Sequence, residues 1–306
     1  MEKLHFRENA PEKGSNIELI LHVLRHGDRN LNGSLEEYGR ERTKETARQS
    51  HLRGESFDIV KSYGSTAGPK IKVDGEDLEM QRSLETAHIF GKEIAGDKLY
   101  KTRPRNVLNY KTMALDMPFD YLKIHEDFAR EYIRETLQLA DKKFDDLPEE
   151  DKKEVSEYAD TKSVEHLMSQ KTENAMGTKK EIAGSFAVLI KQYVKMIMEK
   201  LKSNQKLLFP LGSHTGMIEP FLAETIIWKN KNDEEVHGAT LDEIGGNFKP
   251  TEGFDIILKT DRSGQLESVK LRFDNQNRFG GEALLDMNKI DEFAKFYLEL
   301  HKKQEE

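Results

Sequence analysis

Two apolar stretches constrain the fold of this chain more than any other feature. Residues 17–24 and 206–211 each have the length and composition of a buried strand. The first runs directly into Arg25-His26-Gly27, and the second leads through Gly212 into Ser213-His214-Thr215. Ligands of α/β sheets bind beyond the carboxyl ends of strands, so these two histidine-bearing loops are the first candidates for a site.

Helical patterns separate and follow these strands. Ser34-x-x-Glu37 has the form of a capping box, and Met80, Leu84 and Ala87 form part of an apolar stripe at helical spacing. Strands that alternate with helices predict an α/β protein, a three-layer α/β/α sandwich with a mainly parallel central sheet. The expected elements are helices over 34–51, 79–95 and 288–302, a helix from the second strand to about residue 228, a strand at 57–60, and a hairpin of 253–259 with 266–273.

The middle of the chain follows a different pattern. Residues 96–125 are irregular, and residues 126–201 are mostly helical and strongly charged, with breaks near Pro148 and Gly177. A chain of 306 residues can form one large domain. We therefore expect a single domain over 1–306, with a helical insertion or cap at about 96–205.

Composition excludes several classes of protein. With no cysteine, the chain has no disulfide scaffold, no cysteine nucleophile and no thiolate metal site. A net charge of -8, with 34% charged residues, argues against a general nucleic-acid-binding surface. No window approaches the roughly 18 apolar residues of a membrane span, and the N-terminus lacks a signal-peptide core. We expect a cytoplasmic protein without nucleic-acid or membrane partners.

Residues 24–29, Leu-Arg-His-Gly-Asp-Arg, provide what phosphoryl transfer requires. Arginine binds the anionic oxygens through a planar set of donors, and a neutral imidazole can attack phosphorus. Arg25 and Arg29 could therefore hold the group while His26 attacks it. The alternative is a polar loop with an incidental histidine.

Four motifs together resemble the histidine phosphatase superfamily, which includes phosphoglycerate mutases and acid phosphatases. They are LRHGDR at 24–29, NGSLEEYGRERTKETA at 32–47, QRSLETA at 81–87 and FPLGSHTGMI at 209–218. Their order and approximate spacing agree with the family across residues 17–228. The resemblance implies a phosphoglycerate mutase-like fold.

The resemblance also implies roles for particular residues. His26 is the expected nucleophile and becomes phosphohistidine, while Arg25, Arg82 and His214 bind phosphoryl oxygens. Arg29 matches a second arginine of many phosphatases of the group. Asn32 and Ser65 lie where polar residues of the phosphate pocket could fall. Taken singly, Arg82 could instead be an exposed helix arginine and His214 a capping or core histidine.

The proton donor is the least determined part of the expected site. Thr215 follows His214 where the acid phosphatases have aspartate, so the chain looks closer to the mutase-like branch, whose acid is a glutamate between the main motifs. The Gly-x-Trp-Glu-Gly signature beyond that glutamate is absent. Glu126 is the first candidate and Glu131 the second. Either could instead be an ordinary first-turn helix carboxylate.

These observations predict a metal-independent phosphatase that hydrolyses a phosphomonoester through phosphohistidine on His26. The substrate could be a small molecule or a protein. A phosphoglycerate-type mutase and a non-catalytic phospho-ligand binding protein of the same fold are the alternatives. We expect no metal and no cofactor, because His22 and His26 lie on a strand and its loop and the paired glycines lack a phosphate-loop context. The oligomeric state is left open.

Overall fold

The computed structural model describes most of the chain: residues 13–29, 33–66, 69–72, 79–99, 105–106, 119–139, 141–169 and 178–305. The helices are α1 (Glu37–Gln49), α2 (Arg82–Leu99), α3 (Phe119–Glu135), α4 (Glu149–Ser169), α5 (Lys179–Glu199), α6 (Ile218–Thr225), α7 (Leu241–Ile244) and α8 (Met287–Glu305), with short 3-10 turns η1 (Phe144–Asp146) and η2 (Phe279–Gly281). The strands are β1 (Glu18–Arg25), β2 (Ile59–Val60), β3 (Tyr63–Gly64), β4 (Ile71–Lys72), β5 (Glu79–Met80), β6 (Arg105–Asn106), β7 (Lys206–Ser213), β8 (Ile226–Lys229), β9 (Glu235–His237), β10 (Gly253–Lys259), β11 (Lys270–Phe273) and β12 (Glu282–Leu285).

The main sheet is half parallel and half antiparallel. Its order is β6-β3-β7-β1-β10-β11-β12-β8-β9, with β2 paired to β7. The ladders that join β6, β3, β2, β7 and β1 are parallel, whereas those from β1 through β10 to β9 are antiparallel. The expectation of a mainly parallel sheet is therefore wrong for the second half. Three of its ladders, β8–β9, β10–β11 and β11–β12, join consecutive strands through loops, which favours antiparallel pairing, whereas β1–β10 and β12–β8 join strands far apart in the chain.

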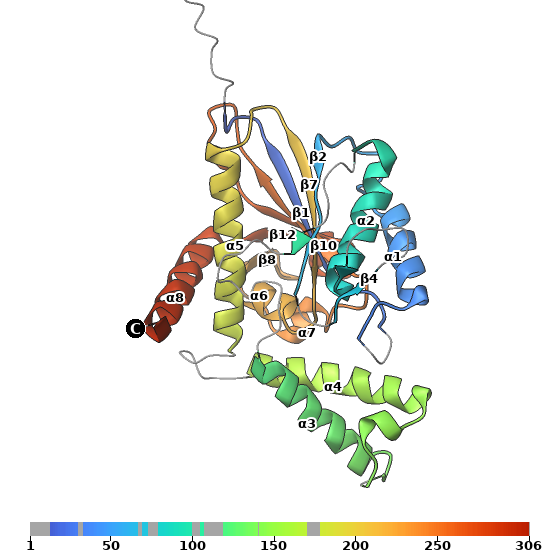
Figure 1. Ribbon diagram of the computed structural model, residues 1–306. Helices are drawn as coiled ribbons and strands as arrows, with labels where there is room; N and C mark the ends of the chain where they lie inside the picture. The colour runs from blue at the N-terminus through green and yellow to red at the C-terminus, as the bar shows by residue number, and fades with distance from the viewer. Residues whose placement is uncertain are drawn as a thin grey trace, which may run out of the picture.

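Helices cover both faces of the sheet, as predicted (Figure 1). Successive side chains of β1 point to opposite faces. Leu19 and Leu21 join the larger core, to which α5 and α8 contribute, while Ile20 and Leu24 join the core formed with α1 and α2. A strand buried on both faces needs a continuous apolar run, which residues 19–24 provide except at His22.

Some expected elements differ in detail. The N-cap of α1 is Glu36, and it forms no side-chain cap hydrogen bond, so the capping box expected at Ser34 is wrong. The helix expected to run to residue 228 ends at Thr225, where β8 begins and joins the antiparallel half of the sheet. The hairpin of β10 and β11 is confirmed.

A pair of helices, α3 and α4, lies beyond the end of the sheet at which β1 and β7 finish (Figure 1). The pair has a small core of its own, formed by Ala129, Ile133, Leu147, Val155 and Ala159. The third helix of the expected insertion, α5, packs against α8 and the sheet and so forms part of the sandwich. Within the described ranges, no helix combines the length and the apolar character needed to cross a bilayer.

Candidate functional site

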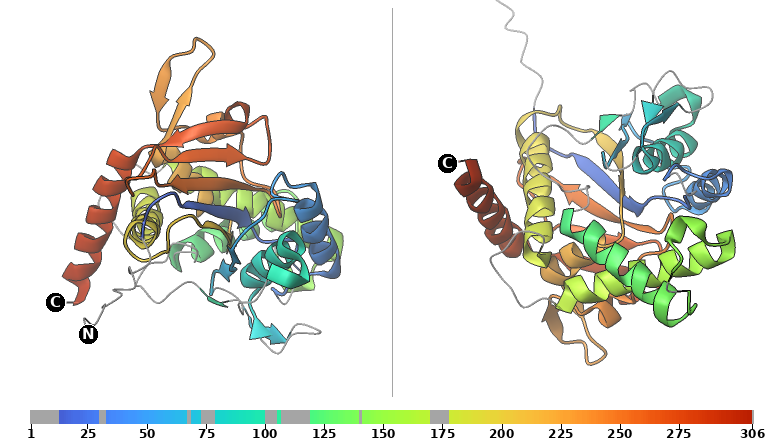
Figure 2. Two further views of the ribbon diagram at one scale, coloured as in Figure 1. Left: turned by 90° about the horizontal axis from the view of Figure 1, so that it is seen from above. Right: turned by 60° about the horizontal axis from the view of Figure 1, so that its bottom comes forward.

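A cavity of about 780 Å³ lies between the carboxyl ends of β1 and β7 and the α3–α4 pair. We call it the His26 cavity. Figure 2, right, shows the two helices in front of the ends of these strands. Its inner part is lined by Arg25, His26, Arg29, Arg82, Asp160, His214 and Thr215. The parallel pairing of β1 with β7 places Arg25 beside Ser213, which brings the two predicted loops together.

His26 lies at the base of this cavity and is 7% exposed. Its Nδ1 lies 2.8 Å from the carbonyl oxygen of Gly27, and because a carbonyl only accepts, Nδ1 carries the proton and Nε2 keeps its lone pair. Burial, followed by the charges of Arg82, His214 and Arg25, holds the pKa of His26 well below 6.5. The ring is therefore neutral near pH 7 and has a free nucleophilic nitrogen.

Two arginines flank His26, of which Arg82 is buried and Arg25 is partly buried. Arg25 donates from Nη1 to the carbonyl oxygen of Phe248 (2.7 Å) and from Nη2 to Asp160 (2.8 Å). Arg82 is 8% exposed and donates from Nη1 to the carbonyl oxygen of Gly33 (3.2 Å). Burial, together with the charges of Arg29 and Arg25, lowers the pKa of Arg82 to about 10, so it stays charged near neutral pH. The Nε atoms of Arg25 and Arg82 are buried and have no hydrogen-bond partner among the described residues.

His214 is the second imidazole of the cavity. Its ring centroid lies 4.9 Å from that of His26, at an angle of 68°. Nε2 lies 2.8 Å from Ser65 Oγ and 3.3 Å from Ser83 Oγ, whereas Nδ1 is buried and has no partner in the described part of the chain. Burial and the arginine charges hold the pKa of His214 well below 6.5. With Nε2 accepting from a serine hydroxyl, the Nδ1 proton of the neutral ring is available to an anion.

Of the other three residues expected in the phosphate pocket, Arg29, Ser65 and Asn32, only Arg29 lines the cavity among the described residues. Arg29 lines the cavity, and its charge affects the pKa values of Arg82 and His214, so it belongs to the same electrostatic site. Ser65 lies behind His214 and orients its ring, and it is not part of the cavity wall. Asn32 lies outside the described residues.

The local packing explains how these side chains are held. The backbone N–H of Gly27 donates to Thr86 Oγ1 (3.1 Å), which itself donates to the carbonyl oxygen of Arg82 (2.8 Å), so α2 is tied to the His26 loop. A Cβ on Gly27 would lie 2.9 Å from Leu35 Cδ1 and 3.0 Å from the carbonyl oxygen of Gly39. Gly27 therefore gives α1 room to pack. Its position in the loop would instead suggest that it gives a ligand room to approach.

Sequence reasoning missed Asp160 and His125. Asp160, on α4, accepts from Arg25 Nη2, and its other oxygen lies 3.2 Å from His125 Nε2 on α3. Burial raises the pKa of Asp160, but the close approach of His125 and the charges of Arg25, His125 and Arg29 outweigh it and lower this pKa to about 2. Both side chains line the His26 cavity. Asp160 is one of many charged residues of α4. The only sequence signal that could single it out is the small apolar residue before it, Ala159, which is buried in the structure.

The two predicted glutamates lie farther from the arginines. Glu126 lines the cavity, but its side chain is 66% exposed and pairs with Arg130 at 3.2 Å. Glu131 accepts from the Tyr158 hydroxyl (3.0 Å) and so links α3 to α4 away from the cavity wall. Glu126 therefore lies at the rim of the cavity, and Glu131 forms a contact between α3 and α4.

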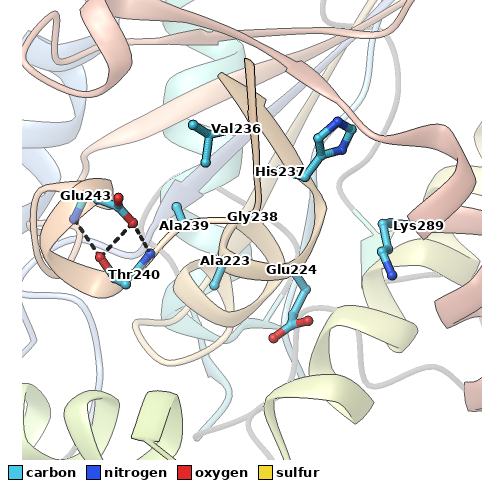
Figure 3. A pocket seen from close by; sticks show the side chains of 9 residues that line it. All are labelled: Ala223, Glu224, Val236, His237, Gly238, Ala239, Thr240, Glu243 and Lys289. Atoms are coloured by element: carbon cyan, nitrogen blue, oxygen red, sulfur yellow. Dashed lines mark hydrogen bonds between the residues drawn. The ribbon is translucent and has the colours of Figure 1, made fainter. Parts of the chain in front are cut away.

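A second, shallower pocket of about 360 Å³ lies between the β8–β9 hairpin and the start of α8 (Figure 3). Its charged side chains take part in local contacts: His237 pairs with Asp286 at 2.8 Å, and Glu243 caps α7 through Thr240. No cluster of buried cations resembling that around His26 lines it. The described residues hold no group of three or more His, Asp or Glu side chains placed to bind a metal ion.

No protein-family model matches the chain. No curated protein matches it either. Among solved structures, it is similar to a Hafnia alvei phytase in complex with tartrate (TM-score 0.44, 10% identity, 94% of this chain and 96% of that one). It is also similar to a Klebsiella phytase (TM-score 0.40, 12% identity, 94% and 96%) and to a mycobacterial glucosyl-3-phosphoglycerate phosphatase (TM-score 0.36, 14% identity, 84% and 97%). These proteins are histidine phosphatase superfamily members. The likeness is distant, and the assignment of the site rests on its own geometry.

Proposed function

We propose that the protein is a phosphatase of the histidine phosphatase type, which hydrolyses a phosphomonoester through a phosphohistidine on His26. The observation that carries this proposal is the set of buried donors around a neutral imidazole. Arg25 Nε, Arg82 Nε and His214 Nδ1 have no acceptor among the described residues. A buried donor without an acceptor destabilises the folded protein, and a phosphoryl group offers three anionic oxygens as acceptors.

The chemical steps follow from these groups. His26 Nε2 attacks phosphorus, the ester P–O bond breaks, and the leaving oxygen takes a proton from an acid of the site. Water then attacks the phosphohistidine, gives a proton to the conjugate base of that acid, and the P–N bond breaks to release phosphate. Arg25, Arg82 and His214 stabilise the charge that the transferred group carries throughout.

We propose Asp160 as this acid, ahead of Glu126. Asp160 lines the cavity beside Arg25, and its charge affects the pKa values of Arg82 and His214, which supports a role near the proposed phosphate ligands. Without substrate it is ionised and pairs with Arg25. A bound phosphoryl dianion disfavours a second negative charge beside it and so raises the pKa of Asp160. Substrate binding thereby favours the protonated form that donates to the leaving group.

An aryl phosphate assay tests the proposal. Wild type should hydrolyse para-nitrophenyl phosphate in excess EDTA, and His26→Ala should lose at least about 10³-fold in kcat. Activity that EDTA abolishes, or that His26→Ala keeps, would reject the mechanism. Phosphoryl exchange between phosphoglycerate isomers without net phosphate release would instead support the mutase. Phosphate binding without turnover of any phosphomonoester would support the binding protein.

A further inference from the structure

We infer that the outer part of the His26 cavity is a second anion subsite, so that the substrate is a small molecule with a second phosphate remote from the one removed. This inference rests on the proposed function for the identity of the first phosphate. The subsite is formed by Arg130 and Arg134 of α3 and by Lys142 and Lys143 of the segment before η1. We call these four residues the outer cations.

The charge of the cavity supports this inference. Seven arginine and lysine side chains line it against three carboxylates, those of Glu126, Asp145 and Asp160. The chain as a whole has the opposite balance, with 48 basic and 56 acidic residues. A single phosphoryl group is already served by the inner arginines and imidazoles. The outer cations exceed what its binding requires, and a cavity lined by one sign of charge attracts a ligand of the other.

Two of the outer cations, Arg130 and Arg134, lie on α3. Ala129 and Ile133 are four residues apart, as are Arg130 and Arg134, so the two pairs form neighbouring rows on one side of α3. Ala129 and Ile133 are 8% and 3% exposed, and Phe144 of η1 also lines the cavity. Along α3, Ala129 and Ile133 lie between His125, which contacts Asp160, and Arg134, so this wall is partly apolar between the inner ion pair and Arg134. A ligand with an uncharged middle and an anionic group at each end matches this order.

The outer cations can exchange their present partners for a ligand. Arg130 pairs with Glu126 (3.2 Å) and Arg134 with Glu135 (2.7 Å), and all four of these side chains are between 59% and 71% exposed. Exposed ion pairs of this kind contribute only about 0–1 kcal/mol. Lys142 and Lys143 are exposed and line the cavity. Binding an anion here requires no buried contact to be broken.

The size of the cavity favours a small molecule as the ligand. About 780 Å³ lies within the range of roughly 300–1,000 Å³ typical of pockets that enclose small ligands. The residues that line the cavity come mainly from the loops at the strand ends and from the segment of α3 and α4. A bisphosphorylated sugar-sized compound can contact both walls at once.

Binding measurements test the subsite without requiring turnover. Fructose 1,6-bisphosphate and fructose 6-phosphate share a sugar and differ by one phosphate. We expect the His26→Ala protein to bind the bisphosphate at least about tenfold more tightly by calorimetry, which corresponds to about 1.4 kcal/mol. The preference should decrease with added salt, because exposed charges are screened over about 8 Å at physiological ionic strength.

A matched pair of variants assigns the preference to the outer cations. In the His26→Ala background, Lys142→Gln with Lys143→Gln should reduce the ratio of the two affinities by about tenfold, since two cations are lost from the subsite. The control is Lys195→Gln with Lys295→Gln. These lysines lie on α5 and α8, 66% and 77% exposed, and their loss changes the net charge by the same amount. The control should keep the ratio.

Each outcome separates the subsite from the catalytic proposal. Equal affinity for the two sugars, or a preference that the Lys142 and Lys143 substitutions leave intact, overturns the subsite even if wild type hydrolyses para-nitrophenyl phosphate. A preference that depends on these lysines supports it even if no ester is hydrolysed. Tighter binding of a phosphopeptide with acidic flanks than of the bisphosphate overturns the assignment to small molecules.

Discussion

The guanidinium of Arg25 and the carboxylate of Asp160 lie 2.8 Å apart, and this ion pair joins the end of β1 to α4. It brings the proposed acid into contact with an arginine that we propose binds the phosphoryl group. The α3–α4 pair, which has a core of its own, is thereby tied to the end of the sheet at which β1 finishes. In the proposed mechanism, the pair therefore supplies the acid in addition to lining the cavity.

Replacing Asp160 should affect esters according to their leaving group. For Asp160→Asn we expect a loss of about 10²–10⁴-fold in kcat with an alkyl phosphate, whose alkoxide needs a proton, and little loss with para-nitrophenyl phosphate. Glu126→Gln should reduce kcat equally little for both. A leaving-group-dependent loss in Glu126→Gln, with none in Asp160→Asn, would identify Glu126 as the acid, as the sequence suggested.

The fall of kcat/KM on the acid side of the pH profile should reflect the protonation of His26. Protonation removes its nucleophilic lone pair, and its pKa lies well below 6.5 through burial and the charges of Arg82, His214 and Arg25. Wild-type kcat/KM should therefore persist below pH 6.5. Arg82→Gln removes one of these charges, so its acid limb should move upward toward 6.5 while kcat/KM falls about 10- to 150-fold from the lost hydrogen bonds.

Arg42→Gln is the control for this profile. Arg42 is partly exposed, pairs with Asp28 at 3.3 Å and does not line the His26 cavity. Its profile should follow that of the wild type. An acid limb that stays in place in Arg82→Gln would show that the arginine charges do not set the protonation of His26.

Gly212 should tolerate no side chain. A Cβ there would lie 1.9 Å from the carbonyl oxygen of Ser83 and 2.6 Å from its carbonyl carbon. Because backbone atoms move only with their element, Gly212→Ala should displace the start of α2 and with it Arg82. We expect a loss of about 1–3 kcal/mol in the free energy of unfolding, measured with urea, and a higher KM. Unchanged stability and KM would contradict this close approach.

A buried charge cluster beneath the site should control stability. Asp255 accepts from His22 Nδ1 (2.8 Å), His51 Nε2 (2.7 Å) and Arg272 Nη2 (2.8 Å). Asp255→Asn leaves these groups without their carboxylate and should cost about 3–5 kcal/mol in the free energy of unfolding. The exposed Asp233→Asn, which removes a surface pair with Lys229, should cost less than about 1 kcal/mol.

The pH dependence of this stability follows from the lowered pKa of Asp255. Hydrogen bonds from His22 and His51 and their charges outweigh the effect of burial and lower the pKa of Asp255 below its usual 3.8. A depressed pKa stabilises the folded state above pH 3.8, and this contribution is lost as the pH falls below it. Urea denaturation of wild type should show this loss, and Asp255→Asn should show a smaller slope over the same range.

The first core strands and the groups around His26 were predictable because their signals are local. The apolar runs that form β1 and β7 each end at a histidine, and the motif around Arg82 follows in the expected order. In the structure, the parallel pairing of β1 and β7 brings His26 and His214 within ring contact. Spacing along the chain could not give that distance.

The parts that could not be predicted depend on tertiary contacts. Asp160 is one of 56 acidic residues, and only the packing of α3 on α4 directs it toward Arg25. The strands β8, β9 and β12 have three or four residues each, and a segment such as Glu282-Ala-Leu-Leu285 suits a helix as well as a strand. Pairing along the sheet decides their structure, as is usual for short strands.

Trapping the covalent intermediate tests the central claim most directly. Wild type mixed with a phosphomonoester, quenched in alkali and digested should yield a peptide phosphorylated on His26, stable in base and lost in acid. The same treatment of His26→Ala should yield no phosphorylated histidine. A wild type that turns over substrate without labelling His26, or a His26→Ala protein that labels His214 and stays active, would contradict the assignment of His26 as the nucleophile.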